Sequence, residues 1–222
     1  MNYNIISTGS QGNAVIVNNR ILIDCGVAFK TLKAVYKNLQ IVLLTHIHTD
    51  HFNPQTIKRL AEERPTLRFG CCAWLVNDLL EVGVPKRSID VFEIGKIYDY
   101  KAFKISPIKL YHDCENCGYR IFANGEKAIY ATDTEHLQGI SAKDYDLYMV
   151  ESNYQEAELQ ERINAKLEAG EYIYEYRVAK THLSHEKASE WLLANMGQNS
   201  NYVFLHQHKE RKQSKDWSYK DD

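Results

Sequence analysis

The stretch Thr45-His-Ile-His-Thr-Asp-His51 decides the fold of this chain. It follows a short apolar run that is typical of a buried strand, and it precedes a segment with helical periodicity. Because alternate side chains of an extended segment point the same way, His46, His48 and Asp50 would share one side, with His51 following at the turn. Imidazole nitrogens and carboxylate oxygens are ligands of zinc and other first-row divalent ions. The stretch therefore predicts a metal site at a strand end.

Other apolar runs end in the same types of residue. The run 103–111 is followed by His112, the run 128–132 by Asp133 and the run 202–205 by His206. Because strand ends meet at one edge of a sheet, we expect these side chains to converge on the first stretch. Seven ligands exceed the four of one tetrahedral ion and suit two ions about 3.5–4 Å apart that share a carboxylate. The sequence thus predicts a centre with two divalent metal ions.

Short β-branched runs and periodic helical segments follow one another along the rest of the chain. The strand signature occurs at 4–7, 14–18, 21–24, 41–45, 67–70, 103–111, 117–122, 128–132, 148–151 and 202–205. Helical periodicity occurs at 29–38, 54–63, 73–82, 156–169 and 185–196. This order favours sheets with helices on their outer faces. We expect a single domain over residues 1–208 and a flexible polar tail over 209–222.

Composition excludes several classes of protein. The chain has 222 residues, of which 44% are hydrophobic, a fraction that excludes wholesale disorder. Its 27 basic and 29 acidic residues leave a net charge of −2, so any contact with nucleic acid must be local. No run approaches the ~18 apolar residues of a membrane helix. Residues 1–12 lack a basic stretch followed by an apolar core, so we expect no secretory signal. The five cysteines lack a disulfide spacing, so we expect a cytoplasmic protein.

The chain resembles the metallo-β-lactamase superfamily, and within it the nucleic-acid-processing branch of WalJ-type exonucleases, ribonuclease Z and ribonuclease J. The resemblance rests on Thr8-Gly-Ser-Gln-Gly-Asn-Ala14, Ile21-Leu-Ile-Asp-Cys-Gly26, the stretch His46 to His51, His112-Asp113 with Gly118-Tyr-Arg-Ile121, Tyr130-Ala-Thr-Asp-Thr134 and Phe204-Leu-His206. It implies an α/β (α+β) fold, the four-layer αββα metallo-β-lactamase sandwich. The chain lacks the long insertion of the β-CASP branch and a protruding tRNA-binding arm.

The same resemblance implies a role for each ligand and for several neighbours. His46, His48 and His112 would hold one ion, and Asp50, His51 and His206 the other, with Asp133 between them and Asp24 hydrogen-bonding to the ligands from behind. Zn²⁺ is the expected metal, and Mn²⁺ is an alternative. In Thr181-His-Leu-Ser-His185, His182 would contact the scissile phosphate or protonate the leaving oxygen, so the candidate catalytic residues are Asp50 and His182. Candidate substrate contacts are Ser10, Asn13, Tyr154, Lys180, Ser184 and His185.

These residues favour a dinuclear metal-dependent hydrolase that cleaves phosphodiester bonds of DNA or RNA through a metal-bridged hydroxide. The expected partner is a nucleic acid or nucleotide substrate, with no membrane, and homodimer formation stays open. A cyclic-nucleotide or other small phosphodiester hydrolase is an alternative with the same chemistry. An acyl or thioester hydrolase of the same fold is a second alternative. A catalytically idle metal-binding scaffold is an alternative of another class.

Overall fold

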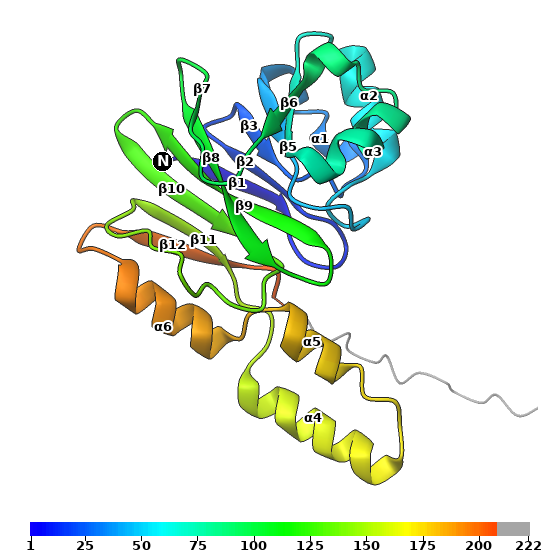
Figure 1. Cartoon of the computed structure of the whole chain (residues 1–222), viewed down its shortest axis with the longest axis vertical. Coiled ribbons are helices and arrows are strands. Elements are labelled where there is room, and N and C mark those ends of the chain that lie inside the picture. The colour runs from blue at the N-terminus through cyan, green and yellow to red at the C-terminus, as the bar shows by residue number, and fades with distance from the viewer. Residues whose placement is uncertain (208–222) are drawn as a thin grey trace, which may run out of the picture.

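Two mixed β-sheets face each other in the computed structural model, which describes residues 1–207 (Figure 1). The first sheet has the order β1 (Tyr3–Ser7), β2 (Ala14–Val17), β3 (Ile21–Ile23), β4 (Ile41–Leu43), β5 (Arg68–Cys72), β6 (Ile89–Phe92). The second has the order β12 (Asn201–Leu205), β11 (Leu147–Glu151), β10 (Glu126–Ala131), β9 (Glu115–Ala123), β8 (Lys104–Tyr111), β7 (Tyr98–Asp99). In chain order, each sheet starts with antiparallel pairs, β1 to β3 and β7 to β10, and continues with parallel pairs, β3 to β6 and β10 to β12.

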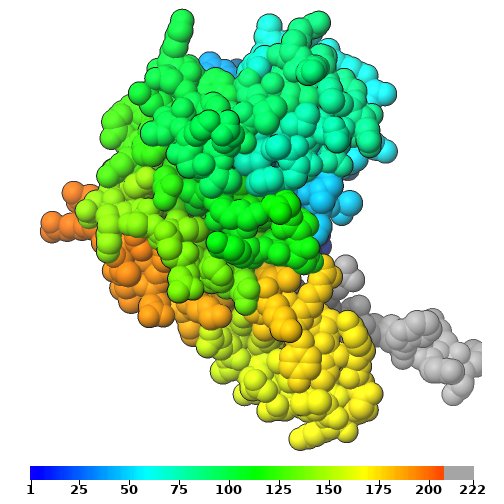
Figure 2. All heavy atoms as spheres, in the orientation of Figure 1, coloured from blue at the N-terminus to red at the C-terminus, as the bar shows by residue number. Residues whose placement is uncertain are grey.

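Helices cover the outer faces of both sheets. α1 (Phe29–Leu32), α2 (Pro54–Glu63) and α3 (Val76–Glu81) lie on the first sheet, together with one-turn 3₁₀ helices at Tyr36–Asn38, Ala73–Leu75 and Lys86–Ser88. α6 (His185–Asn195) lies on the second sheet. α4 (Glu156–Ala169) and α5 (Glu175–Thr181) form a lobe, residues 156–181, that projects from the body (Figures 1 and 2). The layers are helix, sheet, sheet, helix.

The alternation of strand side chains explains why three apolar layers form. Ile41 and Leu43 of β4 point into the core between the two sheets, whereas Val42 and Leu44 point into the core under α2 and α3. On β11, Leu147 and Met149 face the first sheet, and Tyr148 and Val150 face α6. A strand that is buried on both faces has no polar face, so its polar residues come only after its end. This is why the candidate ligands follow the strands.

The predicted αββα sandwich is confirmed. α2 and α4 have the predicted bounds, while the predicted helix 29–38 divides into α1 and a 3₁₀ turn. The chain also forms β6, β7 and α5, which periodicity did not predict. The predicted tail 209–222 lies outside the described residues. Among the helices of residues 1–207, none is long and apolar enough to cross a membrane.

Candidate metal centre

The candidate ligands follow the C-terminal ends of strands from both sheets and meet at one edge of the sandwich. The first stretch leaves β4, and His112, Asp133 and His206 follow β8, β10 and β12. Asp133 and His206 have φ of +57° and +51°, a left-handed conformation in which the chain reverses sharply. Such a backbone is costly for most residues and is found where surrounding structure enforces it. The turns aim both side chains back over the sheet edge.

The structure brings the predicted ligands into overlapping groups. The ligand atoms of His46, His48 and His112 all lie within 4.8 Å of one another, and so do those of Asp50, His51 and His206. A third group, His46, His51 and Asp133, connects these two sets. All seven candidate ligands named in the sequence analysis belong to these three groups. Their nitrogen and oxygen atoms are donors that suit a divalent metal ion.

One buried ring nitrogen shows that the site fits a metal ion. His46 is fully buried, and its Nε2 atom has no hydrogen-bond partner within residues 1–207, whereas its Nδ1 lies 2.9 Å from the hydroxyl of Thr45. A buried polar atom without a partner costs free energy unless a ligand satisfies it. Burial is the main cause that lowers the pKa of His46, so the ring is neutral and its lone pair is available.

Hydrogen bonds at the Nδ1 atoms orient two further imidazole rings. His51 Nδ1 lies 2.7 Å from Asp24 Oδ2, and His112 Nδ1 lies 2.7 Å from the carbonyl oxygen of Thr181. A ring that donates from Nδ1 presents the lone pair of Nε2 to the centre. Asp24 is fully buried and also accepts from the backbone N–H and hydroxyl of Thr45 and from the hydroxyl of Tyr130. Asp24 thus lies where the resemblance implies: it is buried and hydrogen-bonds to the candidate ligand His51.

The buried carboxylate of Asp133 balances the imidazoles around it. Its Oδ2 lies 3.0 Å from His51 Nε2 and 3.0 Å from His206 Nδ1. Burial alone would raise the pKa of Asp133, but His51 and His206 outweigh burial and lower it well below its usual range. Burial would likewise lower the pKa of His51, but Asp133 and Asp24 raise it well above its usual range. The carboxylate of Asp133 therefore stabilises positive charge beside it, whether the charge is on a protonated imidazole or on an ion that replaces the proton at His51 Nε2.

His182 lies beside the ligands and is fixed by a carboxylate that sequence analysis did not single out. Its Nδ1 is 2.6 Å from Oε1 of Glu151, and 3.6 Å from Asp133 Oδ1. Glu151 is fully buried at the end of β11, where its Oε2 accepts from the backbone N–H groups of Thr134 and Leu183. Burial opposes protonation of His182, but Glu151 outweighs it and raises the pKa of the ring. The sequence did carry a signal: an acid ends an otherwise apolar strand.

Asp113 is a second residue whose role the sequence did not reveal. Its Oδ1 lies 3.2 Å from His48 Nε2 and 3.3 Å from His112 Nε2. Its Oδ2 accepts from Nε of Arg177 at 3.1 Å. Asp113 therefore connects two candidate ligands with α5 of the lobe. Asp113 was part of the sequence motif His112-Asp113, but only the fold shows what its carboxylate contacts.

A cavity of about 350 Å³ opens over the centre. Its walls combine candidate ligands with residues of the lobe: Ser10, His48, Asp50, His112, Asp133, Tyr172, Tyr174, Arg177, Val178, Thr181, His182 and His206. Of the predicted substrate contacts, Ser10 therefore lines the cavity. The volume is at the lower end for small-ligand sites, roughly 300–1,000 Å³.

Several other predicted substrate contacts do not line this cavity. Asn13 is buried beneath the centre, with its amide nitrogen 2.8 Å from His51 Nε2, so it positions the ligand stretch. Tyr154 is buried against α4, and the hydroxyl of Ser184 caps α6 by accepting from the N–H of Lys187. All three side chains are buried and contact other parts of the protein.

The last two predicted contacts, Lys180 and His185, also lie away from the cavity lining. The ring of His185 is half-buried, with Nδ1 3.0 Å from the hydroxyl of Ser152 and its face against Phe204. Lys180 is exposed near the end of α5.

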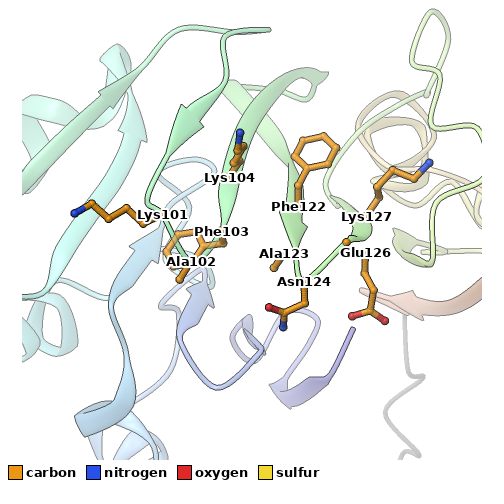
Figure 3. Close-up of a pocket in the computed structure, with 10 residues that line it drawn as sticks. Lys101, Ala102, Phe103, Lys104, Phe122, Ala123, Asn124, Glu126 and Lys127 are labelled. Atoms are coloured by element: carbon orange, nitrogen blue, oxygen red, sulfur yellow. The ribbon is translucent and has the colours of Figure 1, made fainter.

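A second cavity lies at the opposite ends of the same strands, around the β9–β10 turn (Figure 3). Its lysines, Lys101, Lys104 and Lys127, point away from one another, and its one acid, Glu126, pairs with the N-terminal amine. Polar groups that do not converge offer no ligand a common site. The cavity over the metal ligands is therefore the stronger candidate.

Comparison with known proteins places the chain in a family. A family model described as a beta-lactamase superfamily domain matches residues 19–206. No curated protein sequence matches the chain. Similar solved structures include the metallo-beta-lactamase fold protein YhfI from Bacillus subtilis, with a TM-score of 0.69 and 15% identity over 94% of this chain and 87% of that chain.

Two further structures have the same fold. The short form of human tRNase Z (ELAC1) has a TM-score of 0.68 and 15% identity over 93% of this chain and 92% of that chain. Zn²⁺-bound PqqB from Methylobacterium extorquens has a TM-score of 0.67 and 14% identity over 93% of this chain and 88% of that chain. Likeness at these identities shows the fold alone, whereas the family model spans most of the sequence. With its two facing sheets and its histidine-rich edge, the chain belongs to the beta-lactamase superfamily and has the metallo-beta-lactamase fold.

Proposed function

We propose that the protein is a metal-dependent phosphodiesterase that acts on DNA or RNA. The observation that carries this proposal is His182, which lines the cavity where the candidate ligands converge and whose Nδ1 lies 2.6 Å from the buried carboxylate of Glu151. Cleavage of a phosphodiester produces an alkoxide that needs a proton. An imidazole that a buried carboxylate holds in place can supply that proton. Because Nδ1 faces Glu151, Nε2 is the atom available to the leaving oxygen.

The donor set fits two divalent ions, with Zn²⁺ first and Mn²⁺ as the alternative. His46, His48 and His112 would hold one, Asp50, His51 and His206 the other, and Asp133 both. Bound there, the ions would lower the pKa of a water toward ~7 and neutralise charge on the phosphate. Asp24 and the carbonyl of Thr181 keep the imidazoles oriented throughout.

The chain's own groups then account for the remaining steps. A water oxygen attacks phosphorus while the bond from phosphorus to the leaving oxygen breaks. The attacking water loses a proton as it forms the new bond, and the carboxylate of Asp50, which lines the cavity, can accept that proton. His182 donates its proton to the leaving oxygen, and Glu151 stabilises the charged form of the ring before the transfer. One structural neighbour is a tRNase Z, a ribonuclease, which supports this choice of substrate.

The test is a substrate panel on protein whose metal content has been measured. The panel contains single-stranded DNA and RNA, cyclic nucleotides, an aryl phosphodiester and a thioester. We expect turnover of the nucleic acids and the aryl phosphodiester, abolished by a chelator. His182→Ala should lower kcat by about 10²–10⁴ with the metal content unchanged. The matched control is His136→Ala, because this ring packs on Tyr111 and does not line the cavity.

Other results would overturn the proposal in distinct ways. Turnover of cyclic nucleotides alone would make the protein a small-phosphodiester hydrolase. Turnover of the thioester without any phosphodiester would make it an acyl hydrolase. Tight uptake of metal without turnover of any substrate would leave a metal-binding scaffold.

A further inference from the structure

Two tyrosines of the lobe form part of the cavity wall and have no role in the core. Tyr172 is 85% exposed and Tyr174 42% exposed, and both line the cavity together with the candidate ligands. Between them, Ile173 packs into the small apolar cluster of the lobe. The alternation of the connecting segment therefore turns the two aromatic rings outward from the lobe and toward the cavity. A large ring left so exposed contributes little to folding, because burial is what stabilises such side chains.

The segment that carries these rings is held in place at both ends. Gly170 ends α4 in a left-handed conformation, with φ of +68°, and its N–H caps the helix. Lys166 then bridges the segment: its Nζ lies 4.1 Å from the ring centre of Tyr174 and 2.8 Å from Oε1 of the buried Glu175. One face of Tyr174 is thus covered by a cation. A fixed ring binds a flat partner with less loss of entropy than a mobile one.

The lobe is also tied to the metal centre. Arg177 on α5 donates to Asp113, whose other oxygen lies 3.2 Å from His48 Nε2. The carbonyl oxygen of Thr181, at the end of α5, accepts from His112. Figure 1 shows α5 where the lobe joins the body. These contacts keep the tyrosines at a constant position relative to the candidate ligands.

We infer that Tyr172 stacks on the base of an unpaired nucleotide next to the scissile phosphate, with Tyr174 as the adjoining wall. This inference rests on the proposed function and names its substrate class, single-stranded nucleic acid. An aromatic face can stack on any base, so it gives affinity without sequence preference. A base inside a duplex has both faces covered by its neighbours, and a rim side chain cannot reach them. The cavity of about 350 Å³ has room for about one nucleotide at a time.

The experiment compares intact and abasic single strands. The cleaved bond is first mapped on the wild type, and a tetrahydrofuran residue then replaces the nucleotide that flanks it. We expect the KM of the wild type to be about tenfold lower for the intact strand than for the abasic strand, because one stacked base strengthens binding by about this factor. In Tyr172→Ala the ratio of the KM for the abasic strand to the KM for the intact strand should fall to about one, because the KM for the intact strand rises. Tyr172→Phe should keep the ratio, because the ring remains.

Tyr176→Ala is the matched control. Tyr176 is 50% exposed on α5 of the same lobe but does not line the cavity, so the ratio should stay at the wild-type value. A blunt duplex of the same sequence should be cleaved at least tenfold more slowly than the single strand. Equal cleavage of duplex and single strand, no abasic effect in the wild type, or a full effect retained in Tyr172→Ala would each overturn the inference. If the wild type cleaves no phosphodiester at all, it is the proposed function that fails.

Discussion

Replacing Gly26 with alanine should disrupt the metal centre through the backbone alone. A Cβ atom at this position would lie 1.7 Å from the carbonyl oxygen of Asp50 and 2.7 Å from the amide nitrogen of His51. Non-bonded atoms pack at about 3.5–4 Å, so the ligand stretch would have to move by about 1.5 Å or more. No flexible side chain can yield here, because both neighbours are backbone atoms of candidate ligands.

The size of the effect follows from the hydrogen bonds that such a movement breaks. Asn13 N donates to Asp50 O at 2.6 Å, Cys25 N to His51 O at 2.8 Å, and Gly26 N to Asn13 O at 3.0 Å. Each contributes about 1 kcal/mol net. Losing two or three should therefore lower the free energy of unfolding by about 2–3 kcal/mol, which agrees with the usual cost of overpacking. Zinc affinity should fall at least tenfold, because two ligands are displaced.

Two measurements on the same protein check this prediction. Urea unfolding in the presence of a chelator gives the stability of the metal-free chain, and competition with a chromophoric chelator gives zinc affinity. Gly139→Ala is the control: its added Cβ meets no atom within 4 Å, so it adds only the strain of a φ of +78°. That variant should bind zinc as the wild type does. Wild-type zinc affinity in Gly26→Ala would refute the close approach of the two segments.

Three further predictions concern carboxylates. Glu151→Gln should lower kcat about 10–100-fold, because it removes the charge that favours protonated His182. Zinc affinity should change little, because Glu151 is not a candidate ligand. An unchanged kcat in steady-state assays would contradict this role of Glu151. Asp24→Asn should weaken zinc binding about 10–100-fold by competition assay, because an amide nitrogen would face the donors of His51 and its neighbours. Burial opposes ionisation of Glu175, but the ion pair with its lysine partner on α4 lowers its pKa below 4.5. The pair therefore stabilises the lobe above about pH 4.5 and loses this effect as the pH falls, so the stability difference between wild type and Glu175→Gln should shrink in acid unfolding experiments.

The fold and the clustering of the candidate ligands could largely be predicted because each depends on local spacing. A buried strand has no polar residues until it ends, so the position of His112 or Asp133 after an apolar run places it at the sheet edge without knowledge of the tertiary structure. The bounds of α2 were predicted because Asn53 accepts from the N–H of Thr56 and Pro54 begins the first turn.

Contacts between distant segments could not be predicted in this way. Periodicity did not reveal that Glu175 begins a helix, in which its buried carboxylate pairs with Lys166 on α4. Asn13 and Ser184 have polar side chains in motifs near the site, which favoured substrate contact. Their burial could not be read from the sequence, because burial depends on packing partners far away in the sequence. Glu151 was missed for the opposite reason, since its role appears only when β11 lies next to His182.

The contacts between the lobe and the centre connect substrate binding to the orientation of the ligands. His112 keeps its Nε2 toward the centre only while the carbonyl of Thr181 accepts from Nδ1, and that carbonyl ends α5. Because α5 also joins the body through Arg177 and Asp113, it cannot move without disturbing the surroundings of His48. A change that displaces α5 should therefore alter the orientation of His112 and His48 as well as the position of the tyrosines, and the fixed lobe keeps both sets of side chains in one arrangement.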